Sequence, residues 1–242
     1  MSSVIVTDIV RADQTTIDAL AVHGVATVHE AMGRVGLVGP SVHPVQQGAR
    51  IAGSAVTVLC WPGDNLMIHA AVEQCQAGDI LVVSTTSPSL DGSFGELFAT
   101  ALTYRGVRGV VTTGGVRDVV DLRAMNFPAW AGAQNAQGTV KATAGSVNVP
   151  IVVGGAIIRP GDVVVADDDG VLCVPRGEAD TALTASDARV EKEAAARAAY
   201  LNGDLSLDRN DLRGVLADLG VRYVTQQEYT DGDHRRRDLD HD

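Results

Sequence analysis

Residues 80–84 read ILVVS, an unbroken apolar run that Gly78 and Asp79 separate from the segment before it. Strands in which apolar and polar residues do not alternate are typical of sheets covered on both faces. Upstream, residues 51–59 (IAGSAVTVL) predict another strand, and residues 64–76 predict a helix capped by its first residue, an aspartate. The stretch therefore predicts a strand, a helix and a second strand in succession.

The same alternation continues downstream. The expected elements are a loop over 85–93, a helix over 94–104, a strand over 107–112 (VRGVVT), a tight turn at Gly114-Gly115 and a helix over 116–125. Strands and helices that alternate at this spacing favour right-handed crossovers and a partly parallel sheet. The sequence thus predicts an α/β fold.

The flanking segments extend this pattern. Two short helices are expected within 13–32, with a break at Gly24, and several strands joined by Gly and Asp turns are expected over 149–174. Residues 178–202 are rich in Ala, Glu and Arg and predict a long helix, and another helix is expected over 208–219.

These elements predict three parts of the chain. We expect an α/β core domain over 1–177 and a C-terminal helical arm over 178–224, which packs on the core or on a neighbouring subunit. Residues 225–242 are expected to form a disordered tail, because 231–242 (DGDHRRRDLDHD) contain a single apolar residue.

The composition disfavours several classes of function. The 242 residues carry 19 Lys and Arg against 30 Asp and Glu, a net charge of −11 that opposes binding to nucleic acids. No apolar run is long enough to span a bilayer and no export leader opens the chain, so we expect no membrane partner. The 3 cysteines are far apart in the sequence, which favours buried free thiols and a cytoplasmic location.

Two loops are candidates for the chemistry, because each follows an apolar strand and opens a helix. They cover residues 91–98 (DGSFGELF) and 114–118 (GGVRD). In an open parallel sheet, loops at the carboxyl ends of neighbouring strands face a common crevice where ligands bind. Because the first-turn amides of a helix have no partner within the helix, the N–H groups of 95–98 are suited to hold a carboxylate.

Arg117 and Asp118 supply complementary chemistry in the second loop. A guanidinium binds a carboxylate or an enolate oxygen in a fork, and it stays protonated. A carboxylate beside it can anchor Mg²⁺ or Mn²⁺, which accept few protein ligands and keep several waters. The alternative from spacing alone is a helix-capping aspartate beside a solvated arginine.

Other polar groups favour structural roles. The run Asp167-Asp168-Asp169-Gly170 lacks the pattern of a calcium loop and is typical of a turn between strands. His29 and His69 lack the spacing of a zinc site, so we interpret them as structural or surface residues. The sequence contains no glycine fingerprint for nucleotides and no Gly-x-Ser-x-Gly elbow.

Several separated motifs together resemble those of the class II pyruvate aldolases that cleave 4-hydroxy-4-methyl-2-oxoglutarate and 4-carboxy-4-hydroxy-2-oxoadipate. The matching stretches are 24–31 (GVATVHEA), 62–65 (PGDN), 73–75 (EQC), 78–80 (GDI), 106–109 (GVRG), 115–118 (GVRD), 137–141 (QGTVK), 147–150 (VNVP) and 161–171 (GDVVVADDDGV). The resemblance extends from about residue 8 to 224 and is specific because the motifs occur in the right order.

The resemblance implies a layered α/β/β/α sandwich that assembles as a homotrimer or homohexamer and uses a divalent metal, Mg²⁺ or Mn²⁺. It implies cleavage of a 4-hydroxy-2-oxo diacid to pyruvate and a second keto acid, in the catabolism of aromatic compounds. Oxaloacetate decarboxylation is expected as a side activity, because it passes through the same enolate.

The resemblance also implies roles for individual residues. Asp118 would be the protein ligand of the metal, Arg117 would bind the pyruvyl group and stabilise its enolate, and Glu193 would reach a metal-bound water from a neighbouring subunit. The backbone amides that would receive the substrate carboxylate are those of Gly95, Glu96, Leu97 and Phe98. Lys141 and Asn65 are expected to line the pocket.

The sequence departs from the family at two places. Glu96 stands where the family commonly has an Asp beside the acid/base water, and Thr113-Gly114 replace an acidic residue and an alanine. These changes bear on the preferred substrate. The same core resembles the regulator of ribonuclease E activity, a non-catalytic binding protein that lacks the helical arm; that function is the alternative.

Overall fold

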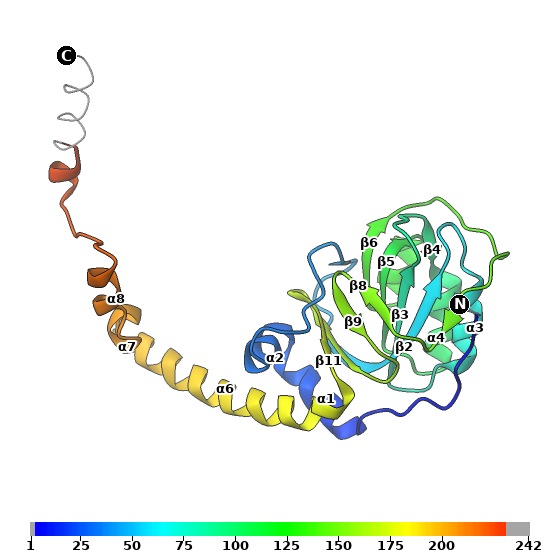
Figure 1. Cartoon of the computed structure of the whole chain (residues 1–242), viewed down its shortest axis with the longest axis horizontal. Coiled ribbons are helices and arrows are strands. Elements are labelled where there is room, and N and C mark those ends of the chain that lie inside the picture. Colours follow the sequence, from blue (N-terminus) through cyan, green and yellow to red (C-terminus); the bar gives the residue numbers. More distant parts are fainter. Residues whose placement is uncertain (1–2, 231–242) are drawn as a thin grey trace, which may run out of the picture. The chain divides into compact units, whose positions relative to one another are not determined.

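A mixed sheet organises the first part of the chain. In the computed structural model, which describes residues 3–230, this part extends to Val190, and a second compact unit begins at Glu191 (Figure 1). The main path of the sheet runs in the order β1-β6-β5-β3-β2-β10-β11, and two short strands pair beside it, β4 with β5 and β7 with β2. The strands are β1 (His43–Pro44), β2 (Ile51–Cys60), β3 (Asp79–Thr85), β4 (Gly92–Phe94), β5 (Gly109–Val116), β6 (Ala129–Gln134), β7 (Ser146–Val147), β10 (Val163–Asp167) and β11 (Gly170–Val174).

The central strands are parallel. β2, β3, β5 and β6 pair in parallel, whereas β10 pairs antiparallel with both β2 and β11. The expected α/β fold with a partly parallel sheet is therefore confirmed. The short strand β6 was not predicted, because its sequence (AWAGAQ) is mostly small residues with one tryptophan and has no clear strand pattern.

Helices cover one face of this sheet. They are α1 (Gln14–His23), α2 (Val25–Ala31), α3 (Leu66–Gln74), α4 (Glu96–Tyr104) and α5 (Val119–Ala124). Asp13 caps α1 by accepting the amides of Thr15 and Thr16, and Gly24 breaks the helical path with a φ of +78°. The two helices and the break at Gly24 match the sequence prediction.

The apolar run at β3 is buried on both faces, as predicted. Leu81 and Val83 pack with side chains of α3, α4 and α5, whereas Ile80 and Val82 pack under a two-stranded sheet made by β8 (Ile151–Val153) and β9 (Ala156–Ile158). A third cluster joins α1 and α2 to β10 and β11. The first unit is thus layered as helices, large sheet and small sheet.

The predicted turn at Gly114-Gly115 is wrong, because both glycines lie within β5. Gly115 pairs with Gly92 of β4, and a Cβ on Gly115 would lie 2.3 Å from the carbonyl oxygen of Leu90. Gly115 therefore allows close approach of two backbones inside the sheet. As a consequence α5 begins at Val119 instead of residue 116.

Of the two predicted C-terminal helices, the long one is confirmed and the second is divided. α6 (Ala179–Leu201) fits the expected long helix, and Ala179 and Ala182 at its start are buried against the sheet of the first unit. The expected helix over 208–219 is instead two, α7 (Ser206–Arg209) and α8 (Leu212–Asp218), because Asp211 adopts a left-handed conformation with φ +53°.

The start of the expected tail is also helical. Residues 226–230 are helical, and Thr225 and Glu228 form a capping box: the Thr225 amide donates to Glu228 Oε2, and the Glu228 amide donates to Thr225 Oγ1. The rest of the expected tail, residues 231–242, lies outside the described residues.

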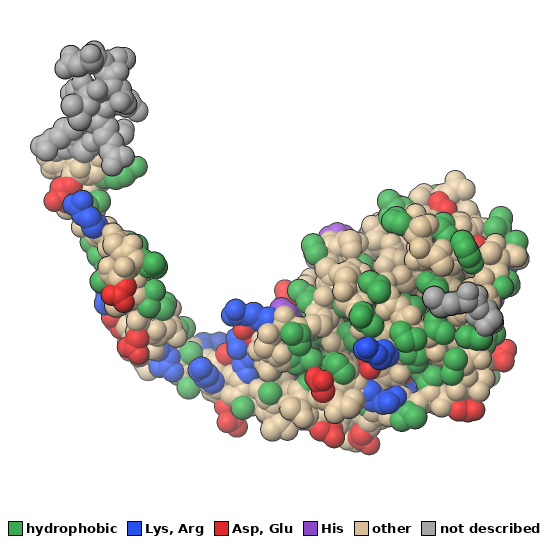
Figure 2. All heavy atoms as spheres, in the orientation of Figure 1, with side chains coloured by type: hydrophobic (Ala, Val, Ile, Leu, Met, Phe, Trp, Pro, Cys, Tyr) green, Lys and Arg blue, Asp and Glu red, His purple; other side chains and the backbone are tan. Residues whose placement is uncertain are grey.

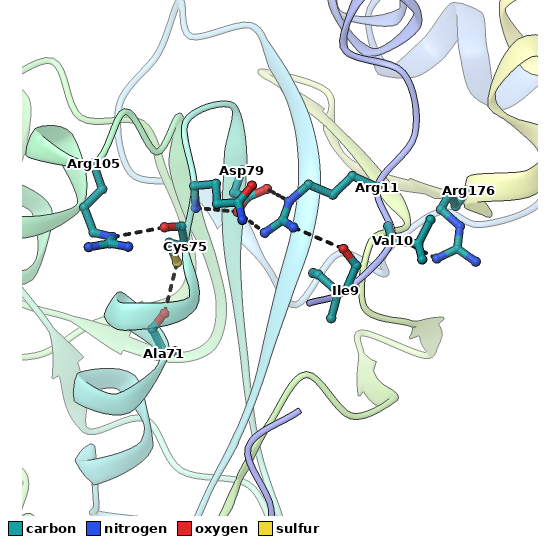
Figure 3. Close-up of polar contacts among 9 residues, drawn as sticks. Ile9, Val10, Arg11, Ala71, Cys75, Asp79, Arg105 and Arg176 are labelled. Atoms are coloured by element: carbon teal, nitrogen blue, oxygen red, sulfur yellow. Dashed lines mark hydrogen bonds and ion pairs between the residues drawn. The ribbon is translucent and has the colours of Figure 1, made fainter. Parts of the chain in front are cut away.

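The N-terminal segment is tied across the edge of the core. Arg11 donates from Nε to Asp79 Oδ1 (2.7 Å) and from a terminal nitrogen to Asp79 Oδ2 (2.8 Å), and also to the Ile9 carbonyl (Figure 3). Asp79 also accepts the amide of Gln76 at 2.7 Å. The side chain of Asp79 is only 1% exposed, so this is a buried, fully paired carboxylate.

Candidate functional site

A pocket of about 250 Å³ lies where the loops predicted from the sequence meet. Its walls come from the start of α3, from β4 and the first turns of α4, from the end of β5, and from the loop that follows β6. The lining residues are Asn65, His69, Val72, Ser93, Gly95, Leu97, Phe98, Ala101, Arg117, Asp118 and Lys141. The two candidate loops therefore share one crevice, as expected at the carboxyl edge of parallel strands.

Gly95 lets the two loops touch. A Cβ on Gly95 would lie 2.4 Å from Asp118 Oδ2 and 3.0 Å from Arg117 Cγ. The backbone of Arg117 is held by donation to the Phe94 carbonyl at 2.9 Å. A side chain at residue 95 would push the carboxylate away, so glycine is required here for proximity.

Asp118 occupies a special backbone conformation. Its φ is +54° and its ψ is +40°, the left-handed region, between the end of β5 and the start of α5. Aspartate tolerates this region better than most residues, and such conformations cluster at functional sites. The conformation directs the carboxylate toward the start of α4, where Oδ2 accepts the Glu96 amide at 3.2 Å.

Arg117 and Asp118 form a loose pair. The Nε to Oδ2 distance is 3.6 Å, and the side chains are 46% and 40% exposed. Ion pairs this exposed contribute little to stability. Both groups can therefore turn toward a ligand at small cost.

The start of α4 offers two further donors. The first hydrogen bond of this helix runs from the Ala99 amide to the Gly95 carbonyl, so the amides of Leu97 and Phe98 have no acceptor within the helix. An anionic oxygen is favoured at such a position. The predicted carboxylate cradle at 95–98 thus keeps two amides, while that of Glu96 binds Asp118.

Asn65 brings a buried polar group to the pocket. The residue is 7% exposed, and Nδ2 donates to the Ser93 carbonyl at 3.0 Å. This bond fixes which end of the amide is the nitrogen. The other end, Oδ1, is buried and has no hydrogen-bond partner among the described residues.

Asp64 fixes the loop that carries Lys141. Its Oδ1 accepts the Leu66 amide at 2.8 Å, and Oδ2 accepts the amides of Ala142 and Thr143, each at 2.7 Å. Burial acts to raise the pKa of Asp64, but these backbone hydrogen bonds outweigh it and hold that pKa below its usual value. Asp64 was predicted only as a helix cap, yet it also positions one wall of the pocket.

His69 lies on this wall, and its ring contacts that of Phe98 in a tilted arrangement, with ring centroids 4.5 Å apart and an angle of 55° between the ring planes. The pKa of the imidazole is lowered by desolvation in the pocket wall and by the nearby Lys141 cation. The neutral imidazole is therefore favoured at neutral pH. The sequence interpretation of His69 as a structural or surface residue omits its place in the pocket lining. Helical periodicity indicates this place once Asn65, four residues earlier, is known to line the pocket.

The donor set suits a small hydrated cation. Asp118 is the single carboxylate that lines the pocket, and no group of three His, Cys, Asp or Glu side chains converges among the described residues. A zinc site would need three or four such ligands, whereas Mg²⁺ commonly takes one or two carboxylates and fills its shell with water and substrate. Asp118 fits the second case.

Two predicted catalytic residues are not among the lining residues. Glu96 accepts the Thr100 hydroxyl at 2.8 Å, along the outside of α4. Glu193 belongs to the second unit. Their roles stay predictions.

The other polar candidates are structural, as expected. Asp167 Oδ2 accepts the Val25 amide at the start of α2. Cys60, Cys75 and Cys173 are free and buried, and burial raises the pKa of each thiol to about 12. Ser93, Val72 and Ala101 were not predicted for the pocket, because small and apolar side chains carry no chemical signal in sequence.

Several known proteins are similar to this chain. The family model described as RraA-like, Aldolase/RraA, matches residues 25–173. Two curated relatives carry the name "Putative 4-hydroxy-4-methyl-2-oxoglutarate aldolase". The one from Halalkalibacterium halodurans is 32% identical over 143 residues, 59% of this chain and 68% of the relative. The one from Burkholderia multivorans is 34% identical over 142 residues, 59% of this chain and 86% of the relative.

Among solved structures, a similar fold is found in Streptomyces coelicolor. That protein, RraAS2, is described as an unusual member of the RNase ES inhibitor RraA protein family. The TM-score is 0.72 at 25% sequence identity, over 78% of this chain and 99% of that one. The comparisons therefore include relatives named as aldolases and a relative named as belonging to an inhibitor family.

Proposed function

Because the chain belongs to the RraA-like family of aldolases and RraA proteins, we propose that it is a divalent-metal-dependent aldolase. The substrate is a 4-hydroxy-2-oxo diacid such as 4-hydroxy-4-methyl-2-oxoglutarate or 4-carboxy-4-hydroxy-2-oxoadipate. The products are pyruvate and a second keto acid. Oxaloacetate decarboxylation is a side activity.

One observation carries this proposal. An arginine and an aspartate at the end of β5 face the start of α4 across a pocket, with no side chain at Gly95 between them. The pocket therefore combines two amide donors, a guanidinium and a carboxylate whose Oδ1 has no hydrogen bond to the described residues.

The chain's own residues account for binding of the pyruvyl half. The amides of Leu97 and Phe98 receive its carboxylate at the helix start. Arg117 lies beside them and donates to the oxygen on C2.

The cleavage itself moves a proton and an electron pair. The C4 hydroxyl loses its proton, a C4 carbonyl forms, the C3–C4 bond breaks, and its electrons become the enolate of pyruvate. Arg117 stabilises the negative charge on that enolate oxygen, and protonation at C3 then gives pyruvate. A preorganised charge of this kind accounts for about 3–4 kcal/mol of transition-state stabilisation.

Asp118 would hold the cation, Mg²⁺ or Mn²⁺. When bound, it supplies Lewis-acid polarisation of the 2-oxo group. Glu96 and Glu193 are the proposed acid/base side chains, with Glu193 contributed by a neighbouring subunit in a homotrimer or homohexamer. Within residues 3–230, the helices lack the length and apolarity that crossing a bilayer requires. The buried free thiols of Cys60, Cys75 and Cys173 support our proposal of a cytoplasmic location.

A coupled pyruvate assay tests the proposal. The protein is incubated with each of the two hydroxy-oxo diacids and with oxaloacetate, with Mg²⁺ or Mn²⁺ and again with excess EDTA. We expect pyruvate release with metal and its loss with EDTA. Metal-independent release, or trapping of pyruvate on the protein by borohydride, would contradict the proposal.

The second candidate is a non-catalytic binding protein of the RraA type, which the likeness to the Streptomyces coelicolor protein supports. Absence of pyruvate release from all three acids under both metals would favour it. On the face shown in Figure 2, acidic and basic side chains of the first unit are interspersed with uncharged surface, which gives no preference for a nucleic-acid partner.

A further inference from the structure

Asn65 is the most deeply buried polar side chain that lines the pocket without being satisfied. It is 7% exposed, and its Oδ1 has no donor among the described residues, whereas Nδ2 is already bonded to the Ser93 carbonyl. A buried acceptor left unpaired is costly, so native structures rarely keep one without a role.

The hydrogen bonds around Asn65 fix its orientation. Its backbone amide donates to the Val140 carbonyl at 3.0 Å, and the adjacent Asp64 clamps the same loop. If the side-chain amide rotated by half a turn, Oδ1 would face the Ser93 carbonyl, which is an acceptor as well. The amide therefore presents an oxygen, and not a nitrogen, as its remaining polar atom.

An acceptor with this orientation selects a ligand that brings a donor. At neutral pH, the carboxylates and the 2-oxo group of an oxo acid accept hydrogen bonds but donate none. The one donor on a 4-hydroxy-2-oxo diacid is the hydroxyl on C4, and oxaloacetate has no such group.

We propose that Asn65 Oδ1 accepts a hydrogen bond from the substrate's C4 hydroxyl and makes the site specific for hydroxyl-bearing oxo acids. This inference rests on the proposed aldolase function and adds a specificity-determining residue to it. The bond aligns the hydroxyl whose proton is lost when the C3–C4 bond breaks, whereas decarboxylation of oxaloacetate does not use it.

The test compares two reactions of one protein. Asn65→Leu removes the acceptor with little change in volume. We expect kcat/KM for 4-hydroxy-4-methyl-2-oxoglutarate cleavage to fall about 10–100-fold further than kcat/KM for oxaloacetate decarboxylation. If both fall together, or the ratio is unchanged, Asn65 has only a structural role and the inference is overturned.

Asn135→Leu is the matched control. Asn135 also donates Nδ2 to a backbone carbonyl, that of Leu90 at 2.9 Å, but its Oδ1 is already satisfied by the Gln137 amide. We expect this variant to leave the ratio of the two activities unchanged. A change in the ratio equal to that of Asn65→Leu would attribute the effect to loop structure and overturn the inference.

A measurement on the unaltered protein covers the case in which Asn65→Leu does not fold. With oxaloacetate decarboxylation as the reporter, 4-hydroxy-4-methyl-2-oxoglutarate and 4-methyl-2-oxoglutarate are compared as competitors. We expect the hydroxyl-bearing acid to compete at a concentration about 10-fold lower. Equal competition would overturn the inference while leaving the aldolase proposal in place; if oxaloacetate and the hydroxy acid both fail to give pyruvate, the proposed function itself has failed.

Discussion

The protein contains two arginine–aspartate pairs that differ in almost every respect. Arg11 and Asp79 meet in a fork at 2.7 and 2.8 Å, with side chains 20% and 1% exposed (Figure 3). Arg117 and Asp118 are adjacent in sequence, yet their closest contact is 3.6 Å and both are more than a third exposed. The same two residue types thus form a closed pair at one end of β3 and an open pair at the end of β5.

The difference shows what makes a pair available to a ligand. Asp79 has its oxygens occupied by Arg11 and by the Gln76 amide, so it has no capacity for another partner. Asp118 uses one oxygen, Oδ2, for its neighbours. We expect changes in the closed pair to alter stability and changes in the open pair to alter activity.

Replacing the open carboxylate has the largest expected effect. Asp118→Ala removes the one pocket carboxylate that can hold a cation, and we expect metal-dependent pyruvate release to fall by about 10³-fold or more. The free energy of unfolding is expected to fall by only about 1 kcal/mol, because the side chain is exposed and the cost comes from placing alanine in the left-handed region. Retained turnover with Mg²⁺ would refute the role of Asp118.

Breaking the closed pair comes next. Asp79→Asn leaves the Arg11 guanidinium without its buried partner, and we expect the free energy of unfolding to drop by about 3–5 kcal/mol. Urea unfolding followed by circular dichroism measures the change. Asp168→Asn, on an exposed turn, is the control and is expected to cost much less. A loss below about 1 kcal/mol for Asp79→Asn would show that the pair is not a main contributor to stability.

Truncating the open arginine has a slightly smaller expected effect. Arg117→Ala is expected to lower kcat by about 10²–10³-fold through loss of charge beside the enolate. Arg117→Lys keeps the charge but not the planar fork, so it should recover part of the rate. Steady-state pyruvate release measures both. A near-normal kcat for Arg117→Ala would contradict the assigned role.

The smallest expected effect concerns Asp64. Like Asp79, it is a buried carboxylate that accepts backbone amides, but it lies beside the pocket. The pKa of Asp64 is lower in the folded state than in the unfolded state. Its contribution to stability is therefore present in full at pH values above the unfolded-state pKa, and it is lost as the pH falls through the folded-state pKa. Asp64→Asn should therefore destabilise by about 1–3 kcal/mol at neutral pH.

The difference in stability between Asp64→Asn and the unaltered protein should disappear in acid, because Asp64 is then protonated and uncharged in the unaltered protein as well. Unfolding curves at pH 7 and near pH 3, for both proteins, measure the difference. A destabilisation that is the same at both pH values would show that the charge of Asp64 is not involved.

Much of the fold was predictable because its signals are local. The apolar run at 80–84 and the break at Gly24 depend on nearest neighbours in sequence, and both were placed correctly. The turn predicted at residues 114 and 115 is wrong because the reason for Gly115 is non-local: this glycine allows β5 to approach the Leu90 backbone. The spacing of residues in the sequence does not predict a contact between two backbone segments that are distant in the sequence.

The candidate site divides in the same way. Arg117, Asp118 and the start of α4 could be brought together from the topology of parallel strands alone. The unpaired oxygen of Asn65 and the double role of Asp64 could not, because Asn65 bonds to Ser93, 28 residues away, and Asp64 bonds to Ala142, 78 residues away. The role of a polar side chain depends on which of its atoms already have hydrogen-bond partners, and those partners are set by the folded structure.

The lack of a Cβ atom at Gly95 has one more consequence. It makes the carboxylate of Asp118 a neighbour of the α4 backbone, so the position of that carboxylate is set by the main-chain amide of Glu96. Even a methyl group there would force the aspartate to turn while leaving the apolar interior intact. Gly95→Ala is thus a means to obtain a folded, catalytically silent protein in which assembly and ligand binding can be studied without turnover.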